Sequence, residues 1–253
     1  MRFASLGSGS KGNATLVEYG NTRLLIDCGF LLREAEARLD RLGVLPASLN
    51  GILVTHEHAD HIGGVSRLAR KHNIPVWMTS GTCNGWEDPH VPVLNKLNPH
   101  ERFTIGDIEV QPFPVPHDAR EPCHYVLIGG DKRVGVLSDA GSVTPFMREC
   151  LSGCDALMLE FNHDIEMLWN GPYPQKLRDR VGGHLGHLSN EQSATLLQQI
   201  DVSRLQVLAL THISEKNNTP ELARAAACAA LGRDESWMVC AHQERGLDWR
   251  ILA

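Results

Sequence analysis

The stretch HEHADH, residues 56–61, gathers three histidines, a glutamate and an aspartate into six consecutive positions. Imidazole nitrogens and carboxylate oxygens are ligands that suit zinc, manganese and iron. His56 and His58 flank a single residue, so both can reach one cation. Asp60 and His61 can turn toward a second cation. A purely structural role is costly, because each buried polar group without a partner costs about 1 kcal/mol or more. The stretch therefore indicates a metal site.

Other polar residues also follow apolar runs along the chain. HEHADH itself follows GILVT, a run typical of a buried strand. Asp139 follows KRVGVLS, Glu160 ends DALMLE, and His212 follows LQVLALT. His117 follows EVQPFPVP, whose prolines place this segment at the edge or irregular end of a sheet. Loops at the ends of strands are where a rigid sheet presents side chains to a substrate, so these residues are candidate site residues.

Between these strands the sequence predicts amphipathic helices, which makes the fold α/β. LLREAEARLDRLG has helical periodicity and ends at Gly43. Another helix is expected from about residue 64 to residue 71. A third begins at Ser189, where Gln192 three residues later gives the spacing of a capping box. TPELARAAACAALG combines an N-cap threonine, a proline at the first helical position and a closing glycine. HYVLIGG and KRVGVLS form a predicted hairpin.

Length and composition restrict the possible classes. We expect residues 1–253 to form a single domain, since the chain has no internal repeat and no linker. No apolar run approaches the roughly 20 residues that span a bilayer, and MRFASLGSGSKGN lacks the apolar core of a signal peptide. We therefore expect a cytoplasmic protein without a membrane partner. Seven scattered cysteines fit reduced thiols. The net charge of -6 means that any nucleic-acid contact must be local.

THEHADH matches the T-H-x-H-x-D-H signature of the metallo-β-lactamase fold hydrolases, and PHDA, SDAG and LTHIS resemble the later ligand motifs of that family. The resemblance covers nearly the whole chain. It implies a four-layer αββα sandwich with a two-metal site at the sheet edge. It also implies two divalent ions per chain, zinc, manganese or iron. The implied ligands are His56, His58 and His117 for one ion and Asp60, His61 and His212 for the other, with Asp139 bridging them.

Within the family, GSGSKGN, LEFNHD, GPYPQKLRDRVGGHLGHLSN and THISEKNN resemble the YycJ (WalJ) group. That resemblance implies a 5′-to-3′ exonuclease acting on double-stranded DNA, with DNA repair or replication partners. Two neighbouring cations would lower the pKa of a bridging water so that hydroxide exists near neutral pH. Asp139 stands where the true lactamases have a cysteine, which argues against β-lactam hydrolysis. The sequence leaves the oligomeric state open.

A second resemblance, of LE and the later GHLSN to two C-terminal motifs of the tRNA 3′-processing endonucleases, implies the catalytic residues Glu160 and His187, and Asp60 of the metal site is the third catalytic candidate. His187 would act as general acid, and Glu160 would be its carboxylate partner, by likeness to the paired Glu and His of the tRNA 3′-processing enzymes. Alternatively, His187 only packs in its loop, or it takes the place of His212 as a metal ligand. The candidate substrate-binding residues lie just before the helix that begins at residue 189, or at its start. They are Lys176, Arg178, Arg180 and Ser189. The three basic candidates would bind phosphate, or alternatively they form a solvent-exposed surface without a role in binding.

Three residues are left open by the sequence. Asp27 either hydrogen-bonds a ligating histidine or caps a turn. His163 and His184 either belong to the site or are structural. The function also has an alternative, in which the same metal site hydrolyses a small cyclic phosphodiester, thioester or lactone. A metal store without enzymatic activity is less consistent with the sequence, because no ligand position is missing.

Overall fold

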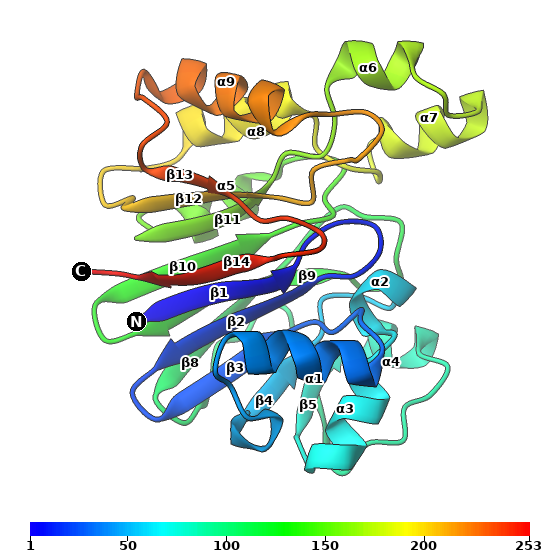
Figure 1. Cartoon of the computed structure of the whole chain (residues 1–253), viewed down its shortest axis with the longest axis vertical. Helices are drawn as coiled ribbons and strands as arrows, with labels where there is room; N and C mark the ends of the chain where they lie inside the picture. Colours follow the sequence, from blue (N-terminus) through cyan, green and yellow to red (C-terminus); the bar gives the residue numbers. More distant parts are fainter.

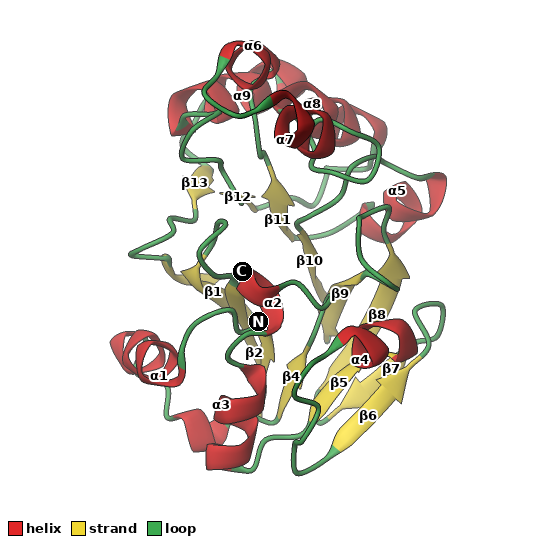
Figure 2. Ribbon diagram, turned by 90° about the vertical axis from the view of Figure 1, so that its right-hand side faces the viewer, coloured by secondary structure: helices red, strands yellow, loops and turns green.

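The computed structural model describes residues 1–253. Two mixed sheets of seven strands each lie face to face (Figures 1 and 2). The first sheet has the order β14-β1-β2-β3-β4-β5-β6. Its strands are β1 (Arg2–Gly7), β2 (Ala14–Tyr19), β3 (Thr22–Ile26), β4 (Gly51–Leu53), β5 (Val76–Thr79), β6 (Leu94–Leu97) and β14 (Leu247–Ile251). The second sheet has the order β13-β12-β11-β10-β9-β8-β7. Its strands are β7 (Phe103–Ile105), β8 (Ile108–Pro114), β9 (Cys123–Gly129), β10 (Lys132–Leu137), β11 (Ala156–Glu160), β12 (Val207–Thr211) and β13 (Met238–Cys240).

Helices cover the outer face of each sheet, so the predicted four-layer αββα sandwich is confirmed (Figure 2). The helices are α1 (Leu32–Arg41), α2 (Ala59–Ile62), α3 (Val65–His72), α4 (Ser80–Gly85), α5 (Pro145–Leu151), α6 (Ile165–Asn170), α7 (Gln175–Val181), α8 (Asn190–Gln199) and α9 (Pro220–Leu231), with a 3-10 turn η1 (Pro46–Ser48). Apolar residues of α1 and α3 pack on the first sheet, and those of α5, α8 and α9 pack on the second. None of the helices is both long enough and apolar enough to cross a bilayer.

A third apolar cluster fills the space between the sheets. It includes Phe3 and Leu24 from the first sheet and Tyr125 and Met158 from the second, all essentially without exposed surface. Burying a large apolar side chain contributes about 1.5–3 kcal/mol. This packing holds the two sheets, and therefore the loops at their common edge, in a fixed relation.

The parallel strands bring the candidate residues to one edge of the sandwich. β3 and β4 are parallel, and β10, β11 and β12 are parallel in the other sheet. Parallel neighbours end at the same side of a sheet, so the loops after these strands are neighbours in space. The prolines of β8, Pro112 and Pro114, lie beyond the residues that pair with β7, so that part of the strand has one neighbour only, as expected.

The predicted signals at helix ends are confirmed. α1 ends just before Gly43, which has a positive φ of 70°. At the start of α8, Ser189 Oγ accepts a hydrogen bond from the Gln192 amide, and Gln192 Oε1 accepts one from the Ser189 amide. This reciprocal pair fixes the entry of the chain into α8 directly after the loop that carries His187.

Candidate active site

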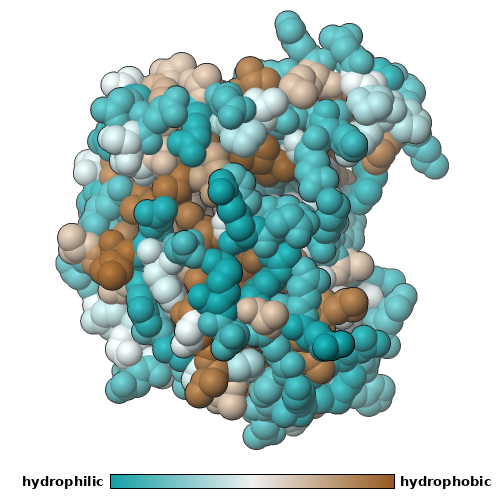
Figure 3. Space-filling model, viewed as in Figure 1, coloured by the Kyte–Doolittle hydropathy of each residue, from teal (hydrophilic) through white to brown (hydrophobic).

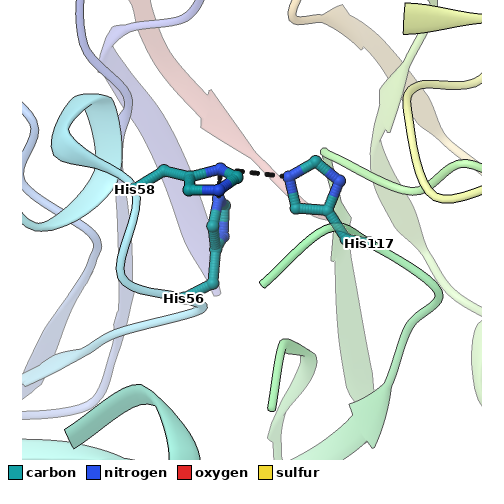
Figure 4. Close-up of side chains that lie close together, drawn as sticks. All are labelled: His56, His58 and His117. Carbon is teal, nitrogen blue, oxygen red and sulfur yellow. Dashed lines mark hydrogen bonds between the residues drawn. The ribbon is translucent and has the colours of Figure 1, made fainter. Parts of the chain in front are cut away.

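Three histidines meet at the edge of the sandwich. His56 and His58 come from the loop between β4 and α2, and His117 follows β8. His56 Nε2 lies 3.1 Å from His58 Nδ1, and His117 Nε2 lies 3.2 Å from the same atom (Figure 4). The structure thus brings together the three predicted ligands of one cation.

The opposite ring nitrogens of these histidines are held by oxygen atoms. His117 Nδ1 lies 3.0 Å from the Gly186 carbonyl oxygen, and His58 Nε2 lies 3.2 Å from the Asp118 carbonyl oxygen. A carbonyl only accepts, so the proton of each neutral ring is assigned to the anchored nitrogen. The free nitrogens then direct lone pairs at a common point. This donor set fits a divalent cation.

The second group surrounds Asp139. His61 Nε2 lies 2.9 Å from Asp139 Oδ2 and 3.6 Å from Asp60 Oδ2. His212 Nε2 lies 3.9 Å from Asp60 Oδ2, is buried, and has no hydrogen-bond partner. A buried nitrogen without a partner is uncommon in folded proteins, and a cation between these residues would satisfy it. All four predicted ligands of the second ion therefore lie together, with Asp139 beside both groups.

Opposite charges within the cluster shift its pKa values in opposite directions. Burial by itself raises the pKa of Asp139, but His212 and His61 hold it well below its usual range. Burial by itself lowers the pKa of His61, but Asp139 and Asp27 hold it well above its usual range. His212 behaves in the same way, with a pKa raised to about 9 by Asp139 and Glu160 against the effect of burial. The negative carboxylates are thus balanced by the positive, protonated imidazoles. A divalent cation would supply the same positive charge in place of the imidazole protons.

Asp27 contacts a predicted metal ligand, as the first of its two predicted roles requires. Its Oδ2 lies 2.8 Å from His61 Nδ1, and its Oδ1 accepts a hydrogen bond from the Thr55 amide. Two further contacts with these histidines were not predicted from the sequence. Asn13 Nδ2 lies 3.0 Å from His61 Nε2, and Thr55 Oγ1 lies 3.0 Å from His56 Nδ1. The glycine-rich GSGSKGN was the available signal for Asn13, and nothing in the sequence singled out the hydroxyl of Thr55.

Strained backbone marks the same strand ends. Asp27, Asp139 and His212 have φ angles of 61°, 48° and 53°, in the left-handed region that side chains with a Cβ rarely adopt. Each residue lies within two positions of the end of β3, β10 or β12. Such conformations persist where the surrounding structure enforces them, and they concentrate at functional sites.

His187 pairs with Glu160 beside Asp139. His187 Nδ1 lies 2.8 Å from Glu160 Oε1, and Glu160 Oε2 accepts hydrogen bonds from the amides of Ala140 and Leu188. Burial by itself raises the pKa of Glu160, but His187 and His212 hold it at about 2, so this carboxyl is ionised. The His187 side chain keeps 18% of its surface exposed, whereas Glu160 is fully buried. His187 is thus oriented by a buried carboxylate and reachable from solvent.

Of the other predicted residues, only Arg180 is held next to a predicted ligand. Arg180 pairs with Asp118, the neighbour of His117, at 2.6 Å. Arg178 donates to the carbonyls of Tyr173 and Trp169, which ties α7 to the end of α6. Lys176 and His184 are exposed. His163 is buried next to Asn162 and outside the metal-ligand groups.

Comparison with known proteins agrees with this geometry. Residues 22–213 match the model of the Beta-lactamase superfamily domain. The chain belongs to this superfamily. It is 34% identical over 239 residues to exodeoxyribonuclease YycJ of Bacillus anthracis, covering 91% of this chain and 89% of that protein. It is also 34% identical over 230 residues to exodeoxyribonuclease WalJ of Streptococcus pneumoniae, covering 88% and 85%. These values place it in the YycJ/WalJ-like group, and it is an enzyme.

Solved structures confirm the fold. The metallo-β-lactamase fold protein YhfI from Bacillus subtilis superposes with a TM-score of 0.75, at 17% identity, and 98% of each chain is covered.

Proposed function

We propose that this protein is a metal-dependent nuclease, and more narrowly a 5′-to-3′ exonuclease acting on double-stranded DNA. The observation that carries the proposal is the His187–Glu160 pair beside a complete set of metal ligands. The proposal is supported by exodeoxyribonuclease relatives that match about nine tenths of the chain. A phosphodiester needs a proton donor for its leaving oxygen, whereas a small ester with a good leaving group does not.

Two divalent cations per chain, zinc, manganese or iron, would be held by the two groups of ligands. The first group is His56, His58 and His117, and the second is Asp60, His61 and His212, with Asp139 shared. When bound, such a pair lowers the pKa of a water molecule and neutralises charge on the attacked phosphate. Asp60 keeps 26% of its side chain exposed, against 3% for Asp139, so it is the carboxylate that solvent reaches more easily.

His187 would supply the proton. Its Nδ1 is held by Glu160, which leaves Nε2 free to donate to the departing sugar oxygen. Because Glu160 is ionised and buried, it fixes the orientation of the ring.

Substrate contacts would come from the segment that surrounds His187. The N-terminus of α8 follows it by two residues, and helix N-termini favour phosphate groups. Arg180, on α7, lies next to the His117 loop through its pair with Asp118. Lys176 extends the basic surface of α7, and with Arg178 and Ser189 it completes the proposed set.

The test uses purified protein loaded with Mn²⁺ or Zn²⁺ and four labelled nucleic acids. They are linear duplex DNA, a covalently closed circle, single-stranded DNA and RNA. We expect short products from the 5′ end of the linear duplex and an intact circle. Rapid cutting of the circle indicates an endonuclease. Nitrophenyl esters, a thioester and a cyclic phosphodiester complete the panel, and preference for one of them with inert DNA overturns the proposal.

A further inference from the structure

Four arginines line a pocket at the open edge of the sandwich, outside the metal-ligand groups. The pocket has a volume of about 510 Å³, within the range of ligand sites in proteins. It is lined by β13 and β14, which are the end strands of the two sheets. On this face, strongly hydrophilic residues gather over the middle of the molecule (Figure 3). The arginines are Arg41 at the end of α1, Arg224 on α9, Arg245 between β13 and β14, and Arg250 on β14.

Little negative charge balances these side chains. The single acidic residue of the lining, Asp248, is paired with Arg41. Arg224 lies 3.7 Å from the exposed Glu235. The polar contact of Arg245 is His242 Nε2, at 2.6 Å, and this nitrogen must act as acceptor. The pocket is therefore a concentration of positive charge on a chain whose net charge is -6.

Arg250 points to a ligand. It is the strand partner of Phe3, whose side chain belongs to the cluster between the sheets, so Arg250 faces inward from the edge strand. Its Nε atom is buried and has no hydrogen-bond partner. Buried donors in folded proteins nearly always have an acceptor, and an oxygen atom of a bound ligand would supply one for this nitrogen.

We infer that this pocket, which we call the edge pocket, binds a phosphate group. Guanidinium groups match phosphate oxygens in pairs of parallel hydrogen bonds, and several of them around one pocket suit a phosphate better than a carboxylate. The phosphate belongs to the backbone of the DNA substrate, and this part of the inference rests on the proposed function. A free nucleotide offers the same group, so the test separates the two sources.

The edge pocket is connected to the metal site through the GSGSKGN loop. The His242 carbonyl accepts a hydrogen bond from the Ser8 amide, and Ser8 Oγ accepts one from the His212 amide. His242, which lines the edge pocket, is therefore hydrogen-bonded to the same loop that supports a metal ligand. Contacts away from the reacting bond improve binding without changing the chemical step.

The first experiment measures the affinity of the metal-loaded protein for duplex DNA with phosphorothioate linkages at its ends, over a range of salt concentrations. Each lost phosphate contact should reduce the slope of log K against log salt by about 1. We expect this reduction in Arg245→Gln and in Arg250→Gln, with kcat unchanged. The matched control is Arg102→Gln, which removes a charge at the opposite edge, next to β7. Arg245 is exposed, so its variant should fold even if the Arg250 variant does not.

The second experiment counts dAMP molecules bound per chain by calorimetry. A double variant, R245Q/R250Q, should bind one fewer than the wild type if the edge pocket takes phosphate. Loss of dAMP with an unchanged salt slope assigns the pocket to free nucleotides. If the salt slope and the dAMP count both stay at wild-type values, the inference is wrong, and the arginines only keep the edge strands from pairing with other molecules. Wild-type protein that neither binds nor cuts DNA overturns the proposed function, while the dAMP count still decides the edge pocket.

Discussion

The two halves of the candidate site are built in different ways. In the first half, His56, His58 and His61 lie within six residues between the end of β4 and α2, and Asp27, directly after the neighbouring strand β3, contacts His61. The second half is assembled from four separate segments: Asp139 follows β10, Glu160 ends β11, His187 precedes α8 and His212 follows β12. The first half depends on local geometry, whereas the second depends on the parallel order of β10, β11 and β12. Substitutions in the two halves should therefore differ in their effects on metal binding and on nuclease activity.

The largest effect is expected where the halves meet, at Asp139. Its Oδ2 lies 2.9 Å from His61, and its Oδ1 lies 3.3 Å from His212. Asp139→Ala should abolish nuclease activity and reduce the bound metal, with a loss beyond the roughly 10- to 100-fold typical of residues that only support a ligand. Activity, metal content by mass spectrometry and thermal melting check this. The fold should remain, because the sheets keep their packing.

Asp118→Asn is the matched control for Asp139→Ala. Asp118 also lies beside a ligand, 3.5 Å from His117 Nε2, but it is absent from every ligand group. It should retain its metal and most of its activity. Full activity and full metal content in Asp139→Ala would contradict the shared role of Asp139.

His187→Ala should separate chemistry from metal binding in the second half. Turnover should fall by about 10²- to 10⁴-fold, the usual range for a positioned proton donor, while the metal content stays unchanged. The loss should shrink on a nitrophenyl phosphodiester, whose leaving group needs no proton. His184→Ala is the control, because His184 is exposed in the same loop. A His187 variant that loses one metal ion shows instead that this residue is a ligand.

Asp27→Asn should produce a smaller effect, confined to the first half. The change keeps the shape of the side chain but removes the charge that holds His61 Nδ1, so metal affinity should fall by about 10- to 100-fold. Metal titration with a competing chelator measures it. Asp155→Asn is the control. Asp155 is also buried, but it accepts hydrogen bonds from the Arg133 amide and the Arg204 side chain, away from the metal ligands. This variant should have a lower melting temperature and unchanged metal affinity. Equal metal affinity in wild type and Asp27→Asn would assign Asp27 to the fold alone.

The sequence predicted the first half of the site better than the second for a physical reason. Ligands that share one short segment leave their spacing in the sequence, as in HEHADH. The Gly186 carbonyl that anchors His117 leaves no such trace, because any residue type supplies a carbonyl. The His187–Glu160 pair was predicted only through the family resemblance, since no spacing rule joins residues of segments distant in sequence.

The same limit applies to the fold and to the edge pocket. Strand ends and helix caps, such as Ser189 with Gln192, are local and were predictable. The order of the strands in each sheet depends on contacts distant in sequence and was not predicted, and the αββα layering was predicted only through the resemblance. Arg41 and Arg250 are more distant still along the chain, so their meeting in one pocket is visible only in the structure.

The smallest effect concerns Ser189, which has two possible roles. Its Oγ accepts a hydrogen bond from the Gln192 amide, and the residue also begins the helix proposed to hold the substrate phosphate. Loss of a cap hydroxyl costs about 1 kcal/mol, so Ser189→Ala should lower the melting temperature by about 2–4 °C. Thr219→Ala is the matched control, because Thr219 caps α9 in the same manner, through the Leu222 amide. Both variants should lose similar stability. If Ser189 only caps the helix, both also keep the wild-type KM for DNA. A raised KM in Ser189→Ala alone, at equal loss of stability, assigns this hydroxyl to substrate binding, because the control has already removed the same amount of helix-cap energy.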